Sequence, residues 1–176
     1  MLLVAVDPGK QGACVLVDTL RPAMRRMVTT YRMPLRDGEW CPWKMRDLIL
    51  SWSYACVERV IIEECHAFPG ISAHANASVM EAYGMWRAAI ATKFLPEQVF
   101  IAPASVWKPA MDLVVPLVKA GKKATAKEKQ AAYTARKAKS LVVARKEFGL
   151  AFATDRGRDL DGEAEAALLA LYGSKL

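Results

Sequence analysis

The stretch that decides the fold is LLVAVDPGKQGACVLVD, residues 2–18. Its opening residues, Leu2–Val6, are all apolar, as in a strand that a sheet buries on both faces. Asp7 and the Pro-Gly pair after it end that strand, and a short turn leads into a second apolar strand at Ala13–Val17. So short a connection makes the two strands antiparallel neighbours. Asp7 therefore stands at an edge of the sheet, next to buried surface.

Downstream of this strand pair, the hydrophobic pattern alternates between further strands and helices. Strands are predicted within Met24–Met33 and at Val60–Ile62 and Val99–Ala102. Helices are predicted at about Pro42–Cys56, Asn76–Lys93, Ala124–Phe148 and Asp161–Tyr172. Loops are predicted at Asp37–Trp43 and Phe68–Ala75, and an irregular stretch or short helix at Pro103–Pro116. This order predicts an α/β fold with a mixed central sheet flanked by helices.

The length of 176 residues fits one domain, 1–176, and a hydrophobic fraction of 53% excludes global disorder and a fibrous repeat. No apolar run approaches a membrane span, and Asp7 interrupts the opening too early for a secretory signal. The four cysteines form no C-x-x-C pair, which favours reduced thiols. We therefore expect a soluble cytoplasmic protein of a bacterial cell or a phage-infected host, with no membrane partner.

The excess positive charge lies in one helical segment at about residues 119–147, which carries ten basic and two acidic residues. The functional interpretation is a surface that contacts nucleic-acid phosphates; the alternative is a solvated helix face. A membrane surface is less favoured, because Tyr133 within the segment and Phe148 directly after it are the only aromatic residues that could contribute to an apolar face. The candidate DNA-binding residues in it are Lys119, Lys122, Lys123, Lys127, Lys129, Arg136 and Lys139.

Acidic residues stand where structural acids are rarely useful. Glu63 and Glu64 follow a buried strand, and strand alternation lets only one of them point the same way as Asp7. Asp161 and Glu165 lie one helical turn apart on one face. The bland alternatives are a turn former at Asp7 and a helix N-cap at Asp161. Together the acids predict a four-carboxylate cluster, whose hard oxygens favour Mg²⁺, with Mn²⁺ as a plausible substitute.

Five motifs occur in an order that resembles a known family: VAVDPGKQGACVLVD, IIEECHAFPG, EAYGMWRAAI, PASVWKPAM and DGEAEAALLALYG. Over nearly the whole chain they resemble the RuvC-type Holliday junction resolvases, in the phage-like branch of the ribonuclease H-like superfamily. The resemblance implies a homodimer that binds four-way branched DNA and makes paired symmetric nicks in DNA recombination and repair. It implies Mg²⁺ as cofactor and no small-molecule cofactor.

The same resemblance implies roles for individual residues. The metal ligands correspond to Asp7, Glu63, Asp161 and Glu165. Catalytic lysines near them correspond to Lys108 and Lys137, with ordinary surface lysines as the alternative. An aromatic residue near the junction centre corresponds to Phe68. The basic loop before Asp161 departs from the family pattern, and its Arg156 and Arg158 are further candidate DNA contacts on account of their charge.

Three other functions stay open at this stage. The chain could be another ribonuclease H-like nuclease, acting on branched DNA or an RNA–DNA hybrid, or a non-catalytic nucleic-acid-binding protein. A sugar-kinase or actin-like ATPase ranks last, because that fold needs two related halves and more chain. Zinc at Cys65, His66 and His74 is disfavoured, because their spacing fits no common zinc site.

Overall fold

The computed structural model describes residues 1–9, 12–21, 28–31, 33–67, 72–115, 125–149 and 161–176. The main sheet has the strand order β3-β2-β1-β6-β7. Its strands are β1 (Leu2–Val6), β2 (Cys14–Asp18), β3 (Val28–Tyr31), β6 (Arg59–Glu64) and β7 (Val99–Pro103). β1 pairs antiparallel with β2 and parallel with β6, as a mixed sheet requires. The predicted α/β class and the antiparallel opening pair are confirmed.

The register of the parallel strands brings two chain segments level at one edge of the sheet. Val6 pairs with Ile62 across β1 and β6, so Asp7 and Glu63 come next to each other at the carboxyl ends of those strands. On the other side of β6, Glu63 pairs with Ala102 of β7. The strand pairing thus carries side chains from three distant parts of the sequence to one place.

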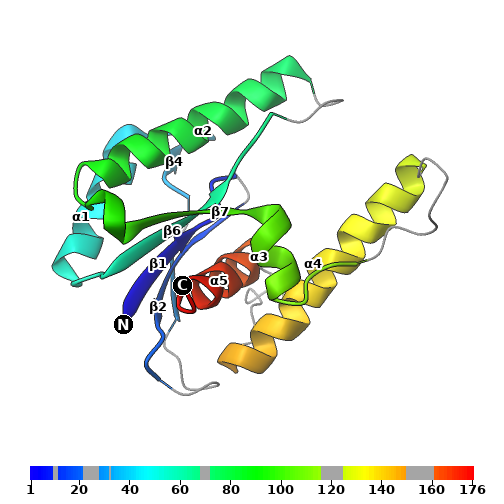
Figure 1. Cartoon of the computed structure of the whole chain (residues 1–176). Helices are drawn as coiled ribbons and strands as arrows, with labels where there is room; N and C mark the ends of the chain where they lie inside the picture. Colours follow the sequence, from blue (N-terminus) through cyan, green and yellow to red (C-terminus); the bar gives the residue numbers. More distant parts are fainter. Residues whose placement is uncertain (10–11, 22–27, 32, 68–71, 116–124, 150–160) are drawn as a thin grey trace.

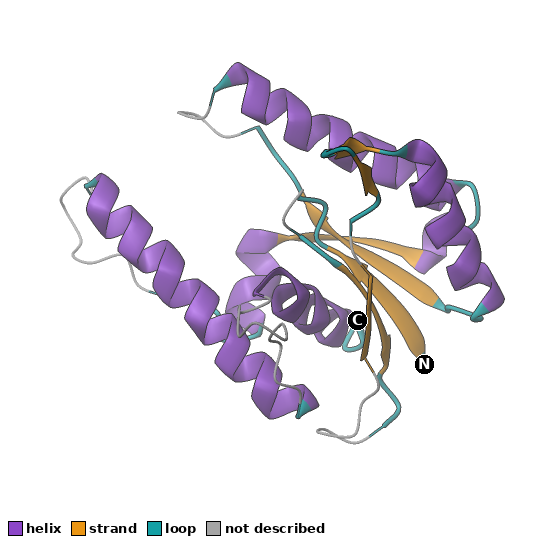
Figure 2. Cartoon of the chain, turned by 180° about the vertical axis from the view of Figure 1, so that it is seen from behind, coloured by secondary structure: helices purple, strands orange, loops and turns teal. Residues whose placement is uncertain are grey.

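Helices cover both faces of the sheet, as Figures 1 and 2 show from opposite sides. They are α1 (Pro42–Tyr54), α2 (Ala73–Ala91), α3 (Ala104–Ala110), α4 (Ala126–Phe148) and α5 (Asp161–Gly173), with a short 3₁₀ turn at Pro96–Gln98. One buried cluster lies under α1 and α2 and contains Trp52 and Trp86. The other lies under α5 and contains Ile61 and Leu168. None of the helices in the described residues is long and apolar enough to cross a membrane.

α5 is the most buried helix of the described chain, with every residue from Ala164 to Leu171 shielded from solvent. Its sequence is rich in alanine, which allows the helix to approach β1 and β6 closely. A Cβ atom at Gly173 would overlap the Ile61 side chain, so the helix and the sheet are in close contact at this end. The close fit fixes the position of the acidic residues at the other end of α5.

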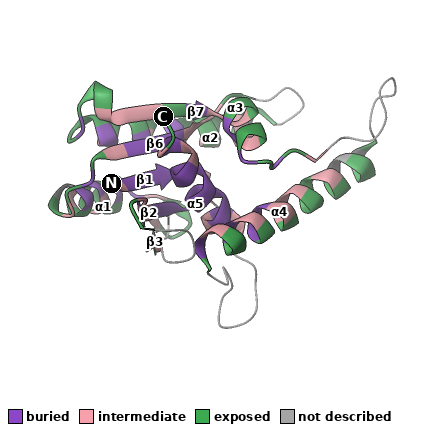
Figure 3. Cartoon of the chain, turned by 60° about the horizontal axis from the view of Figure 1, so that its bottom comes forward, coloured by how far each residue is buried: buried purple, intermediate pink, exposed green. Residues whose placement is uncertain are grey.

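Among the residues that the structure describes, the buried side chains of α4 all lie in its second half. Its buried residues are Ser140, Leu141, Ala144 and Phe148, whereas Figure 3 shows the first half as exposed and intermediate residues that extend away from the sheet. A capping box of Thr125 and Glu128 begins the helix. The predicted helix at about Ala124–Phe148 agrees with this element.

Two loop predictions are wrong in part. Residues 35–40 form a hairpin of β4 (Leu35–Arg36) and β5 (Glu39–Trp40), because Asp37 and Gly38 both adopt positive φ, as tight hairpin turns require. α2 begins at Ala73, inside the loop predicted over Phe68–Ala75, because the Ser72 hydroxyl accepts a hydrogen bond from Ala75 N–H at 3.2 Å and caps the helix. The rest of that loop, residues 68–71, lies outside the described residues.

Candidate active site

Three carboxylates meet where β1, β6 and α5 come together. Each of Asp7, Glu63 and Glu165 has an oxygen atom within 4.8 Å of an oxygen atom of the other two. Asp161 stands outside this group: its side chain is 39% exposed and binds Lys137. The sequence predicts a cluster of four acids, whereas the structure brings three of them together. The fourth, Asp161, lies one helical turn before Glu165 on α5.

The turn after β1 is folded tightly around the Asp7 carboxylate. Gly9 N–H donates to Asp7 Oδ1 at 3.2 Å, and Asp7 N–H donates to the carbonyl of Ala13 at 3.0 Å. A Cβ atom at Gly12 would overlap the Asp7 backbone and side chain. A glycine is therefore needed at position 12 for the chain to pass so close to the carboxylate.

Two lysines lie between the carboxylates. Lys108 Nζ, from α3, is 3.0 Å from Glu63 Oε1 and 3.2 Å from Glu165 Oε2. Lys137 Nζ, from α4, is 2.6 Å from Asp161 Oδ2 and 3.9 Å from Glu165 Oε1. The structure thus places both lysines that the sequence singled out against the acids, in partly buried positions.

Ser140 is a contact that sequence reasoning missed. Its side chain is fully buried, and its Oγ lies 3.2 Å from Glu165 Oε1 and 3.1 Å from the carbonyl oxygen of Arg136. A hydroxyl has one proton, so these two acceptors share it. The only signal in the sequence is a polar residue in the buried half of a helix, which occurs for many reasons.

Burial and mutual repulsion oppose the charge of the carboxylates. Burial raises the pKa of Asp7, and the nearby Glu165 carboxylate raises it further. Burial and the Asp7 charge likewise raise the pKa of Glu63, against the lowering effect of Lys108. These groups would gain from a bound cation, because additional positive charge between them favours their ionised forms.

Both lysines keep their protons despite burial. Burial alone would lower the pKa of Lys108, but Glu63 and Glu165 raise it above the usual value for a lysine. Burial acts in the same way on Lys137, and its hydrogen bond to Asp161 and the Glu165 charge raise its pKa. Two positive charges therefore stand at this edge of the sheet at neutral pH.

The donor set fits a hard divalent cation. All three grouped donors are carboxylate oxygens, which suit Mg²⁺, Mn²⁺ or Ca²⁺ better than zinc. Among the described residues, no other group of acids, histidines and cysteines reaches metal-binding proximity. Cys65 and His74 join no such group, and His66 binds the Glu64 carboxylate at 3.2 Å instead.

Glu64 belongs to the other face of the sheet, as strand alternation requires. Its carboxylate contacts His66, and its charge adds to the effect of burial in raising the pKa of Tyr83 on α2. Glu63 instead contacts Lys108 of α3. Of the two neighbouring glutamates, only Glu63 lies beside Asp7.

The candidate DNA-binding residues have different surroundings. Lys139 binds the Asp112 carboxylate at 3.0 Å, and Arg136 lines a cleft beside Glu63. Lys127 is exposed in the first turn of α4, and Lys129 follows in the same helix. The other candidates lie outside the described residues: Phe68, Lys119, Lys122, Lys123, Arg156 and Arg158.

No protein-family model and no curated protein sequence matches the chain. Among solved structures, Thermus thermophilus RuvC is 16% identical in sequence, with a TM-score of 0.57 over 99% of this chain and 93% of that chain. The same protein in complex with Holliday junction substrate gives 16% identity and a TM-score of 0.57, over 99% of this chain and 92% of that chain. The fowlpox virus resolvase, in complex with Holliday junction DNA, is 12% identical, with a TM-score of 0.44 over 100% of this chain and 99% of that chain. The chain has the ribonuclease H-like fold of RuvC.

Proposed function

We propose that this chain is a metal-dependent, structure-selective DNA endonuclease that resolves Holliday junctions by paired symmetric nicks. The observation that supports this proposal most directly is the group of three carboxylates, with Lys108 and Lys137 beside it, at the edge of a RuvC-like sheet. Asp7, Glu63 and Glu165 would hold the metal, with Asp161 as a further ligand. We propose Mg²⁺ as the natural ion and Mn²⁺ as a substitute.

The carboxylates and the two lysines have different roles in phosphodiester hydrolysis. Asp7, Glu63 and Glu165 would hold a divalent cation, which would activate a water molecule and neutralise charge on the phosphate. Lys108 and Lys137 are protonated and partly buried, so each can bind a phosphate oxygen or give a proton to the leaving 3′ oxygen. The products are then a 5′-phosphate and a 3′-hydroxyl, ends that a ligase can rejoin.

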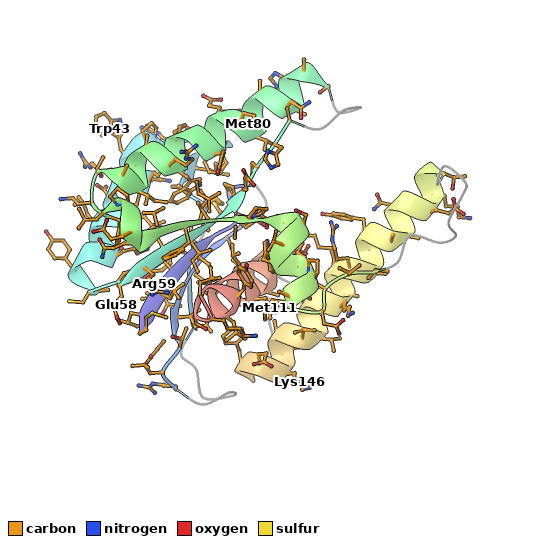
Figure 4. The ribbon with its side chains drawn as sticks, in the orientation of Figure 1. Trp43, Glu58, Arg59, Met80, Met111 and Lys146 are labelled. Carbon is orange, nitrogen blue, oxygen red and sulfur yellow. The ribbon has the colours of Figure 1, made fainter. Side chains whose placement is uncertain are left out.

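Paired nicks at one junction require two active sites, so we propose that the chain acts as a homodimer. Exposed apolar residues on α2 offer a surface for a second copy: Val79 is 36% exposed and Met80 39%, and Figure 4 labels Met80 on that helix.

The test compares three substrates: an immobile four-way junction, a linear duplex and an RNA–DNA hybrid, each with Mg²⁺ and with EDTA. We expect symmetric nicking of the junction with Mg²⁺ alone, and no cleavage by Asp7→Asn although that variant still binds the junction. Equal cutting of the duplex would contradict junction selectivity, and preferential cutting of the hybrid would make the chain a different ribonuclease H-like nuclease. Junction binding without cleavage by the unmodified chain would make it a non-catalytic binding protein.

A further inference from the structure

A cleft of about 660 Å³ opens between α3, the residues that follow α3, and α4. Glu63 and Lys108 form part of its wall, so whatever occupies the cleft lies next to the candidate active site. Most of the other lining residues are apolar or aromatic, among them Leu113, Val114 and Tyr133. Clefts of roughly 300–1,000 Å³ with apolar walls and a few polar groups typically hold small organic ligands or ring systems.

We infer that this cleft binds one nucleobase of the DNA strand held at the active site, with the base against Tyr133 and a phosphate at Arg136. The inference deepens the proposed nuclease function and rests on it. The nucleotide assigned to the cleft is next to the cleaved bond. Its base leaves the stack formed with its neighbours when the DNA binds.

Tyr133 has the surroundings of a stacking residue rather than those of a core residue. Its side chain belongs to the exposed half of α4 and is 44% exposed. Arg136 Cζ lies 5.3 Å from the centre of its ring, and Lys137 Nζ lies 5.5 Å from it. An accessible aromatic ring with two cations beside it matches a nucleotide, because a ring can stack on the base while the cations attract the phosphates.

Arg136 supplies an unsatisfied donor in the same wall. Its Nε atom is buried, and no atom of the described residues accepts a hydrogen bond from it. A buried N–H group without an acceptor is unfavourable, so a shift of the Arg136 side chain that brings Nε to an acceptor on a ligand would be favoured. Phosphate oxygens suit a guanidinium group especially well, because the two can form paired charge-assisted hydrogen bonds.

The opposite side of the cleft offers apolar surface that a base would cover. Val114 is 51% exposed although it follows the fully buried Leu113, and both line the cleft. Lys139 holds this segment against α4 through its bonds to the Asp112 carboxylate and to the carbonyl of Val114. The two walls are thus linked in the protein itself and face each other across the space that we assign to the base.

The free-energy cost of moving a base into the cleft is lower in branched DNA than in a continuous duplex. Moving a base out of a continuous duplex costs stacking and pairing, and that cost is least where the stack is already interrupted. The branch point of a four-way junction is such a place. A cleft beside Glu63 and Lys108 would therefore favour cleavage near the branch point over cleavage within an arm.

The experiment is a double-substitution cycle on binding, without metal and in the Asp7→Asn background, so that it does not depend on cleavage. One set of immobile junctions carries a single abasic site at each position near the branch point. We expect Tyr133→Ala to weaken binding of the intact junction about tenfold, within the range of one base–aromatic stack. On the junction whose missing base normally occupies the cleft, the same substitution should have no effect. Tyr133→Phe should bind like the parent.

Two further variants separate stacking from charge and from surface exposure. Arg136→Gln should weaken binding of intact and abasic junctions alike and reduce the salt slope by about 0.9, the value for one lost phosphate contact. Tyr54→Ala removes a tyrosine that is 86% exposed on α1, on the other side of the molecule, and should change nothing.

Three results would overturn the inference: no effect of Tyr133→Ala, an equal effect on every abasic junction, or a changed oligomeric state of Tyr133→Ala, which would give the cleft to a second copy of the chain. The proposed function fails separately, if the unmodified chain with Mg²⁺ cuts none of the junctions.

Discussion

The two faces of the central sheet are built differently. Under α1 and α2, none of the buried residues in the described part of the chain carries a charge. The rings of Trp52 and Trp86 stack there with centroids 6.0 Å apart at an interplanar angle of 5°. Under α5 the core is also apolar, but at the carboxyl ends of β1 and β6 it gives way to Asp7, Glu63 and the buried Glu165. The first face stabilises the fold chiefly by apolar packing, whereas the second holds carboxylates whose burial opposes folding.

The groups that stabilise the fold are therefore largely separate from the groups proposed to carry out the reaction. Apolar burial contributes roughly 25 cal/mol per Å², so the α1–α2 face can offset the cost of charged groups on the other face. Substitutions on the α1–α2 face should therefore lower the free energy of unfolding and leave cleavage unchanged. Substitutions of the carboxylates on the other face should abolish or reduce cleavage without lowering the free energy of unfolding.

The largest effect should follow from Trp86→Ala on the apolar face. Trp86 is fully buried and stacks on Trp52, so its removal leaves a large cavity, and we expect a loss of about 3–5 kcal/mol in the free energy of unfolding. Urea unfolding followed by circular dichroism measures this loss. At a temperature where the variant is still folded, its junction cleavage should equal that of the unmodified chain.

Trp86→Phe is the matched control for that prediction. It retains an aromatic ring, and we expect less than half of the destabilisation, again with cleavage unchanged. A folded Trp86→Phe variant with impaired cleavage would show that the two faces are coupled, and cleavage would then depend on the packing under α1 and α2.

The opposite sign is expected on the acidic face, where Asp7→Asn should stabilise the fold. Burial raises the pKa of Asp7, so in the folded protein its ionised form is disfavoured and costs stability above the pKa of the unfolded chain. We expect a rise in Tm of about 2–4 °C at pH 7, the shift that about 1 kcal/mol produces in a chain of this size. As the pH falls and Asp7 becomes protonated, the advantage should shrink, and it should vanish below about pH 4. Thermal unfolding between pH 4 and pH 8 measures it.

Metal addition provides the control for the Asp7 prediction. Mg²⁺ at ten times its Kd should stabilise the unmodified chain by about 1.4 kcal/mol, because it binds only the folded site, and Asp7→Asn should lose most of this gain. An equal gain in both proteins would place the ion elsewhere.

Much of this arrangement can be predicted from the sequence, for identifiable reasons. The apolar run Leu2–Val6 and the short turn after it predict β1 and its antiparallel partner. The strand ends predict Asp7 and one of Glu63 and Glu64 at the same edge of the sheet, and the choice of Glu63 comes from the family resemblance. The position of Asp161 outside the group of three could not be predicted, because it depends on how far α5 reaches past the sheet. The lysine contacts depend on α3 and α4 meeting α5, and no local pattern encodes that meeting.

Ser140 illustrates the same limit, and its effect should be smaller. Ser140→Ala removes the hydroxyl that holds Glu165 Oε1, which leaves the more distant Lys137, at 3.9 Å, as the remaining partner of that oxygen. We expect kcat to fall and the Mg²⁺ concentration for half-maximal cleavage to rise about tenfold, as for other groups that orient a metal ligand. Cleavage rates over a series of Mg²⁺ concentrations measure both.

Ser51→Ala is a matched control, because Ser51 also donates to a carbonyl in the preceding turn of its helix, that of Leu48 at 2.6 Å, but is exposed and contacts no described carboxylate. A Ser140→Ala variant with a normal Mg²⁺ requirement would make Ser140 a packing residue.

The smallest effect should come from Glu64→Gln, and it tests the comparison of the two faces most sharply. Glu63 and Glu64 are neighbours of the same type in one strand, so they differ chiefly in the face to which they point. Glu63→Gln should cost cleavage at least about a thousandfold, the equivalent of roughly 4 kcal/mol of transition-state stabilisation. Glu64→Gln breaks only a partly exposed pair with His66, worth at most about 1 kcal/mol to folding, and should change cleavage less than twofold. If Glu64→Gln were the more damaging change, the metal ligand would lie on the α2 face, and the division between a stabilising face and a reactive face would not hold.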